Sequence, residues 1–199
     1  SDVYKRQLLK RADVDGSEVV EVLHATTRGS NIVLERAGPA TALVVTRGFR
    51  DVLQIQRALR WSMYDVQLDK PEPLVPRSLA FEVGERILAD GSVHVALDED
   101  EVRAIAAQIR AAGVEAVAVT FLHSYANAAH ERAAATVLKA ELLDMPITLS
   151  SDVSLQAREY ERANTAVVNV YVSTAIAEYM GLLGDSLEGV GVSAPIWVC

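Results

Sequence analysis

The segment DEDEVRAIAAQIRAAGVEAVAVTFL, residues 98–122, carries the clearest fold signal in the chain. Its acidic opening favours a helix N-terminus, and Asp98 is placed to cap that helix by accepting a hydrogen bond from the Glu101 amide. Apolar residues then recur at helical spacing on one face: Val102, Ile105, Ala106 and Ile109. Gly113 predicts the end of the helix, and the apolar run 114–122 predicts a strand buried on both faces. The segment therefore completes a β-α-β unit.

Upstream of this unit, the pattern predicts two further strands and a short helix. Residues 19–25 are apolar and rich in β-branched side chains, which predicts a strand. A cluster of Thr, Arg, Gly, Ser and Asn follows, and residues 32–36 predict a short helix that Gly38-Pro39 ends. Residues 42–46, with the sequence ALVVT, predict a second strand buried on both faces.

A hairpin is expected immediately before the β-α-β unit. Residues 79–83 and 93–97 are alternating stretches on either side of Asp90-Gly91, a dipeptide that favours a tight turn between antiparallel strands. Residues 61–78 hold three prolines and show no sustained periodicity, so they predict an extended connector. We therefore expect an antiparallel ribbon added to a parallel core.

Downstream, a helix capped by Asn127 is expected to run through Leu143, followed by a strand over residues 147–153. A long helix is expected over residues 155–187, and residues 195–198 predict one more strand. Strands thus alternate with helices along the chain, which indicates an α/β fold with a mostly parallel sheet, flanking helices and an antiparallel ribbon.

Charge and composition restrict the partners and the compartment. The formal net charge of −8 argues against a nucleic-acid partner, because such binding depends on basic residues that neutralise phosphates. The one cysteine, Cys199, excludes an intrachain disulfide and a cysteine-based metal site. His123 and His130 have no Asp, Glu or Cys at metal-ligand spacing, so no metal site is expected. Apolar runs such as residues 114–122 are well short of the ~20 residues that span a bilayer, so we expect a cytoplasmic protein without a membrane segment.

The first candidate site is the loop HATTRGSN, residues 24–31, where a predicted strand leads into a predicted helix. Free backbone amides and the positive end of the helix dipole meet at such a junction, which suits an anion or an amide oxygen. Its polar side chains could orient a substrate or a water molecule: His24, Thr26, Thr27 and Asn31. The alternative is that the hydroxyl and amide groups only cap the helix and that His24 is a structural side chain.

The second candidate site is a polar stripe on the long helix. Its members recur at four-residue spacing and therefore lie on one face: Glu161, Thr165, Asn169 and Ser173. Arg158 and Arg162 adjoin this stripe. Polar groups on a helix that is otherwise apolar need partners, which a ligand cleft could supply. The alternative is a solvated edge with a salt bridge such as Arg158–Glu161.

Several segments together resemble the hydantoinase A, N-methylhydantoinase and 5-oxoprolinase family, which includes acetone and acetophenone carboxylase subunits. The matching segments occur in family order: residues 24–31, 34–38, 46–53, 70–77, 112–119, 122–125, 130–132 and 158–162, with Thr165, Asn169 and Tyr171. The resemblance implies a partial actin-like (ribonuclease-H-like) ATPase fold. It also implies that the histidine–threonine loop and the stripe line a cleft.

The resemblance implies that the parent protein opens a cyclic amide of the hydantoin or 5-oxoproline type, with ATP and Mg²⁺ as cofactors and a hydantoinase B-like subunit or a fused C-terminal half as partner. A ketone carboxylase subunit and a non-catalytic assembly module are the alternatives. We expect residues 1–7 to be a non-native extension, 8–188 the family's N-terminal domain, and 189–199 the start of a further domain.

Two departures from the family pattern affect these expectations. The Asp-x-Gly-Gly-Thr phosphate loop expected before residue 8 is missing, so we expect no cofactor on this fragment and no activity of the fragment alone. Ala25 stands where the family has glycine, and a positive φ there would strain the alanine.

Overall fold

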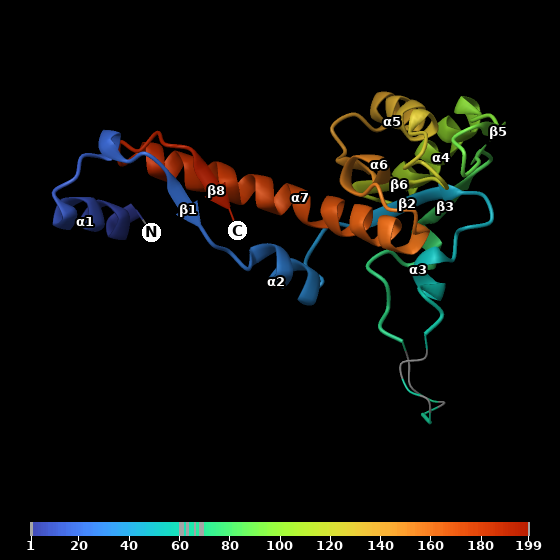
Figure 1. The fold of residues 1–199 in the computed structure, drawn as a ribbon, viewed down its shortest axis with the longest axis horizontal. Helices are drawn as coiled ribbons and strands as arrows, with labels where there is room; N and C mark the ends of the chain where they lie inside the picture. Colours follow the sequence, from blue (N-terminus) through green and yellow to red (C-terminus); the bar gives the residue numbers. More distant parts are fainter. Residues whose placement is uncertain (1, 60–61, 63, 66, 68–69, 199) are drawn as a thin grey trace. The chain divides into compact units, whose positions relative to one another are not determined.

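The computed structural model describes all residues except 1, 60–61, 63, 66, 68–69 and 199 (Figure 1). Cys199 and part of the predicted connector over residues 61–78 therefore lie outside the described residues. The chain divides into two compact units, one formed by residues 1–35 with 172–199 and the other by residues 36–171. We call them unit 1 and unit 2.

A four-stranded sheet forms the centre of unit 2. Its strands are β2 (Thr41–Thr46), β3 (Ala80–Val83), β6 (Ala116–Thr120) and β7 (Ile147–Leu149), in the order β3-β2-β6-β7. Every neighbouring pair is parallel. All residues of β2 and β6 are buried, which confirms the two double-faced strands that the apolar runs predict.

Helices cover both faces of this sheet. On one face, α4 (Glu99–Ala111) and α5 (Ala129–Leu142) pack with Val44, Val117 and Val119 in one apolar cluster. On the other face, α3 (Val52–Ile55) and the part of α7 (Glu159–Glu188) that belongs to unit 2 pack with Leu43, Val45 and Ala118. Alternate residues of β2 and β6 thus belong to opposite apolar clusters, as the pleat requires. The predicted fold class, α/β with a mostly parallel sheet and flanking helices, is confirmed.

The antiparallel ribbon is present, but one of its predicted strands is wrong. β5 (Val93–Val95) pairs with β4 (Arg86–Ile87), not with residues 79–83. Those residues instead form the turn η2 (Arg77–Leu79) and then β3, which pairs with β2 from Leu43↔Ala80 to Thr46↔Val83. The predicted turn itself holds, because Asp90 accepts a hydrogen bond from the Ser92 amide and Gly91 has a φ of 84°.

One helix start and one strand differ in detail from the prediction. Asp98 caps α4, but its side chain accepts from the Asp100 amide at 2.9 Å rather than from Glu101. Asn127 accepts from the Ala129 amide at the start of α5. The strand predicted over residues 147–153 ends at Leu149, because Ser150–Val153 form a short helix, α6.

Unit 1 contains a two-stranded parallel pair between segments far apart in sequence. β1 (Val22–His24) pairs with β8 (Ile196–Val198), with His24 opposite Val198. The remaining elements of unit 1 are α1 (Asp2–Ala12), the turn η1 (Gly16–Glu18), α2 (Arg28–Leu34) and the later part of α7. Helix α2 begins earlier than the predicted residue 32. The domain boundaries expected after residues 7 and 188 stay predictions.

Helix α7 has 30 residues and is long and apolar enough to cross a membrane by length and composition alone. The long helix expected over residues 155–187 is therefore present, but the expectation of no membrane segment rested on uninterrupted apolar runs and did not include it. Its part in unit 2 buries Ala163, Ala166, Val167 and Val170 against the sheet, which is how a core helix of a globular domain packs. A core helix meets the same length and composition criteria.

Candidate functional site

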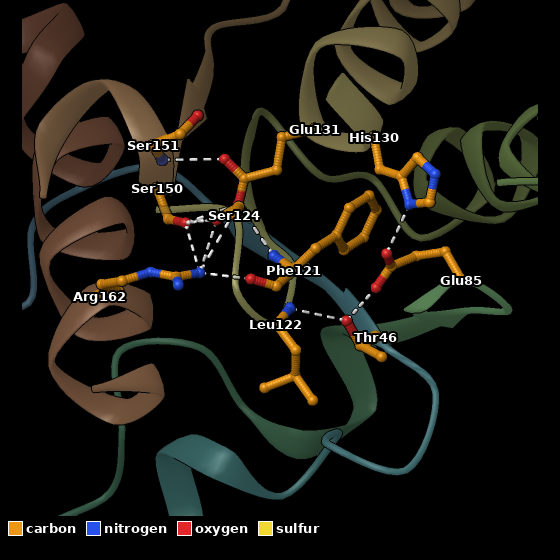
Figure 2. Close-up of polar contacts among 10 residues, drawn as sticks. All are labelled: Thr46, Glu85, Phe121, Leu122, Ser124, His130, Glu131, Ser150, Ser151 and Arg162. Carbon is orange, nitrogen blue, oxygen red and sulfur yellow. Dashed lines mark hydrogen bonds and ion pairs between the residues drawn. The ribbon is translucent and has the colours of Figure 1, made fainter. Parts of the chain in front are cut away.

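The carboxyl ends of β2 and β6 are the place where the topology of unit 2 favours a site. From β2 the chain crosses to β3 on one side, and from β6 it continues to β7 on the other, so the direction of winding changes between β2 and β6. In open α/β sheets, ligands bind outside the carboxyl ends of strands at such a switch point. Two buried polar networks lie at this edge of the sheet (Figure 2).

The first network joins β2 to the start of α5. The Thr46 hydroxyl donates to Glu85 and accepts a hydrogen bond of 2.9 Å from the Leu122 amide. The other carboxylate oxygen of Glu85 lies 2.8 Å from His130 Nδ1, and the side chains of Glu85 and His130 are 0% and 11% exposed. A carboxylate held in this way fixes the imidazole orientation, and its burial without such partners would be costly.

The second network is centred on Glu131, whose side chain is fully buried. Its Oε1 accepts from the Phe121 amide at 2.9 Å and from the Ser150 hydroxyl at 2.6 Å, and its Oε2 accepts from the Ser151 amide at 2.9 Å. Three hydrogen bonds to one carboxylate satisfy most of its acceptor capacity. Glu131 therefore fastens α5 to the segments that follow β6 and β7 (Figure 2).

Arg162 of α7 completes the second network. Its Nη2 donates to the Phe121 carbonyl, to Ser124 Oγ at 2.7 Å and to Ser150 Oγ at 3.0 Å, and it lies 3.9 Å from Glu131 Oε1. The side chain is 1% exposed, and this burial lowers the pKa of Arg162 although the negative charge of Glu131 opposes the shift. Arg162, one of the predicted site residues, thus has protein groups as its partners.

The other predicted residues at the start of α7, and Arg158 just before it, are closer to the surface. Glu161 lies 2.5 Å from Arg57 and 4.0 Å from Arg158, so the salt bridge weighed as the alternative is present. A hydrogen bond from its own backbone amide, and then the Arg57 ion pair, lowers the pKa of Glu161. Thr165 donates to the carbonyl of Glu161, and Asn169 donates to the Thr148 hydroxyl at 3.1 Å. Their role in a ligand cleft stays a prediction.

In unit 1, the structure gives His24 a partner on α7. His24 Nε2 lies 2.6 Å from the hydroxyl of Tyr179, and the two rings are 5.6 Å apart and tilted by 41°. The guanidinium of Arg28 lies over the Tyr179 ring, 5.3 Å from its centroid. His24 and Tyr179 are both half-buried. The expected junction is present, because β1 ends at His24 and α2 begins at Arg28.

The rest of this loop caps α2 only in part. Thr26 accepts from the Arg28 amide at 3.2 Å, whereas Thr27, at the N-cap position, makes no side-chain cap. The Asn31 amide donates to the Thr27 carbonyl within the first turn. Ala25 is not among the described residues with positive φ, so the condition under which alanine would be strained is not met.

The two predicted sets lie in different units, with the His24 loop in unit 1 and residues 158–169 in unit 2. Sequence reasoning missed Tyr179, Glu85 and Glu131 as partners, since each contacts a residue distant in the chain. For Glu131 a signal existed, because a carboxylate directly after His130 in an apolar helix needs a partner. Among the residues that the structure describes, no group of three or more His, Cys, Asp or Glu could hold a metal ion.

Comparison with known proteins identifies the family. A family model described as the hydantoinase/oxoprolinase N-terminal region matches residues 4–142. The chain belongs to this family. The hydantoinase/oxoprolinase match includes the His24 loop and both Glu85 and Glu131, and it ends before α7.

Relatives in the hydantoinase/oxoprolinase family include enzyme subunits. The caprolactamase subunit alpha of Pseudomonas jessenii is 33% identical over 175 residues, which are 87% of this chain and 25% of that protein. The acetophenone carboxylase gamma subunit of Aromatoleum aromaticum is 32% identical over 199 residues, 93% of this chain and 26% of that protein. The chain thus spans about a quarter of the length of these relatives.

The fold is also that of a solved enzyme. The crystal structure of the ATP-dependent caprolactamase from Pseudomonas jessenii matches with a TM-score of 0.87 and 30% sequence identity, over 98% of this chain and 29% of that one. The likeness covers both units and is consistent with the actin-like ATPase fold that the family resemblance implies.

Proposed function

We propose that this chain is the N-terminal part of a cytoplasmic enzyme that opens a cyclic amide in an ATP-coupled reaction. The observation that carries the proposal is the likeness to the ATP-dependent caprolactamase, with a TM-score of 0.87 at 30% identity over 98% of the chain. A lactam, a hydantoin and 5-oxoproline share a ring amide, so the same ring-opening chemistry serves all three. The chain supplies one part of the parent's cleft and is not active alone.

Within that parent, the His24 loop is the part of this chain best suited to contact substrate. His24 is half-buried rather than enclosed, and Thr26, Thr27 and Asn31 place further donors and acceptors at the same junction. An imidazole and hydroxyls can hydrogen-bond the carbonyl and N–H of a ring amide. Arg158, just before α7, and Glu161, Thr165 and Asn169 of α7 are proposed as a second set of cleft residues, within unit 2.

ATP, with Mg²⁺, would supply the energy that makes ring opening favourable, but the described residues do not fit a nucleotide site. The sequence has no glycine-rich phosphate loop. The buried arginine, Arg162, is already engaged by protein groups, and no cluster of carboxylates among the described residues could hold a metal ion. We therefore assign the nucleotide to other parts of the parent or to its partner, a hydantoinase B-like subunit or a fused C-terminal half.

A ketone carboxylase is the second candidate function, because the acetophenone carboxylase gamma subunit is 32% identical over 93% of this chain. A third candidate is a non-catalytic assembly module. The cyclic-amide hydrolase ranks first because the caprolactamase structure matches with a TM-score of 0.87 at 30% identity, against 0.80 at 26% for an acetone carboxylase structure.

The test is ADP release by the complete parent protein with its partner subunit. We expect ADP release that depends on caprolactam, hydantoin or 5-oxoproline, and none with acetophenone or acetone plus bicarbonate. Release only with a ketone plus bicarbonate would establish the carboxylase instead, and no turnover with any of these substrates would leave the assembly module. His24→Ala should abolish most turnover, whereas the matched control His94→Ala, at an exposed position of β5, should not.

A further inference from the structure

We infer that Tyr179 is a positioning residue for His24: its hydroxyl donates to Nε2, which holds the imidazole proton on Nδ1 and fixes the plane of the ring. The inference rests on the proposed role of His24 in the cyclic-amide site. The separation of 2.6 Å between the phenol oxygen and Nε2 is that of a good hydrogen bond. A tyrosine hydroxyl can donate or accept, so the direction of this bond needs a further argument.

Arg28 supplies that argument. Its guanidinium lies 5.3 Å from the centroid of the Tyr179 ring, within the range of a cation–π contact. A positive charge over the ring withdraws electron density from the phenol and makes its hydroxyl a stronger donor. A stronger phenol donor favours Tyr179 donating to His24 Nε2, and this hydrogen bond favours the Nδ1–H tautomer of the neutral ring.

The backbone of unit 1 places His24, Arg28 and Tyr179 close together. His24 is the last residue of β1 and Arg28 the first of α2, so three residues separate the imidazole from the cation. Tyr179 lies on α7 one turn after Ile176, and a Cβ at Gly29 would meet the Ile176 side chain at 3.9 Å. The first turn of α2 therefore packs against α7 at the position of Tyr179. All of these residues belong to unit 1.

A purely structural tether between β1 and α7 is the competing explanation for the Tyr179 contact. A tether predicts that loss of the hydroxyl lowers stability and leaves the chemistry of correctly folded protein unchanged. A positioning residue predicts a change in the His24 tautomer and in turnover without loss of fold. Tyr179→Phe separates the two, because it removes the oxygen and keeps the ring under Arg28.

The first measurement is the tautomer of His24 in the chain labelled with ¹⁵N-histidine, read from the two ring nitrogen shifts at a pH where the ring is neutral. We expect the Nδ1–H form in the wild type and a shift toward Nε2–H in Tyr179→Phe. Arg28→Gln should move the population in the same direction by a smaller amount. A wild-type Nε2–H tautomer, or a population that Tyr179→Phe leaves unchanged, would overturn the inference.

The second measurement is turnover by the parent enzyme with its partner and the cyclic amide that it accepts. Tyr179→Phe should lower kcat by about 10- to 100-fold with little change in KM, because a misplaced catalytic group slows the reaction by such factors. Tyr64→Phe, at a side chain that is 92% exposed, is the matched control. Unchanged kcat in Tyr179→Phe overturns the positioning role alone if His24→Ala is still impaired. If His24→Ala is also fully active, the proposed role of the loop fails with it.

Discussion

Replacing Arg162 by methionine should destabilise unit 2 by about 3–5 kcal/mol, the usual cost of removing one partner of a buried ion pair. The substitution keeps an unbranched side chain of similar length but leaves Glu131, which is 0% exposed, without a counter-charge. It also strips a donor from the Phe121 carbonyl and from two serine hydroxyls. For a unit of this size the loss corresponds to a fall in Tm of roughly 10–17 °C.

Urea unfolding followed by far-UV circular dichroism measures this loss. The matched control on the same helix is Thr165→Ala, since Thr165 is exposed and donates only to the Glu161 carbonyl; it should stay within about 0.5 kcal/mol of wild type. The double variant Arg162→Met with Glu131→Gln should be less destabilised than the sum of the single variants, because the unpaired charge is gone. A loss below about 1 kcal/mol for Arg162→Met, or strict additivity in the double variant, would refute the reasoning.

Three further perturbations test other parts of unit 2. Gly38→Ala should cost about 1–3 kcal/mol in the same unfolding assay, because its Cβ would overlap the buried ring of Tyr171. Thr46→Val should cost about 1–3 kcal/mol, because it removes a donor to a buried carboxylate and an acceptor of the Leu122 amide. The hydrogen bond from Arg77 lowers the pKa of Asp51 in the folded protein below 3.8. The ionised Asp51 therefore stabilises the fold above pH 3.8, and this stabilisation is lost as the pH falls through the lowered pKa. In a series of unfolding curves at different pH, Asp51→Asn should lose less stability on the acid side than the wild type does.

The first two of these predictions have a control variant in the same chain. Gly184→Ala lies inside α7 with no atom within 4 Å of the added Cβ, so it should stabilise by roughly 0.5–1 kcal/mol. If Gly38→Ala behaves like Gly184→Ala, the steric argument is wrong. For Thr46, the exposed Thr136→Val should be neutral within about 0.5 kcal/mol. Identical acid-side slopes for Asp51→Asn and wild type would contradict the linkage argument.

In unit 2, the sequence predicted the strands that are buried on both faces of the sheet. Strands β2 and β6 are buried on both faces, so their apolar runs are unbroken in the sequence. The edge strand β3 has two half-buried residues between buried ends. Its sequence therefore looks like that of a hairpin strand. Its assignment to the sheet depends on pairing with β2, which lies more than thirty residues earlier and leaves no local mark.

The candidate site could be predicted only in its local part. The junction between β1 and α2 was visible because strand, polar cluster and helix are adjacent in sequence. The partner of His24, by contrast, is 155 residues away, and the partner of Arg162 is on another helix. Residue spacing correctly predicted that Glu161 lies near Arg158 at the surface. It could not show that Arg162, the next residue and about 100° further around the helix, is buried.

The adjacency of His130 and Glu131 restricts the length of the loop that precedes them. The two side chains leave neighbouring positions of one helical turn and enter different networks, one reaching Glu85 and Thr46, the other Arg162 and Ser150. Inserting or deleting one residue between Leu122 and Ala129 would rotate both by about 100° and break both networks together. Among natural variants of this chain, that loop should therefore tolerate substitutions at its exposed positions but not changes in length.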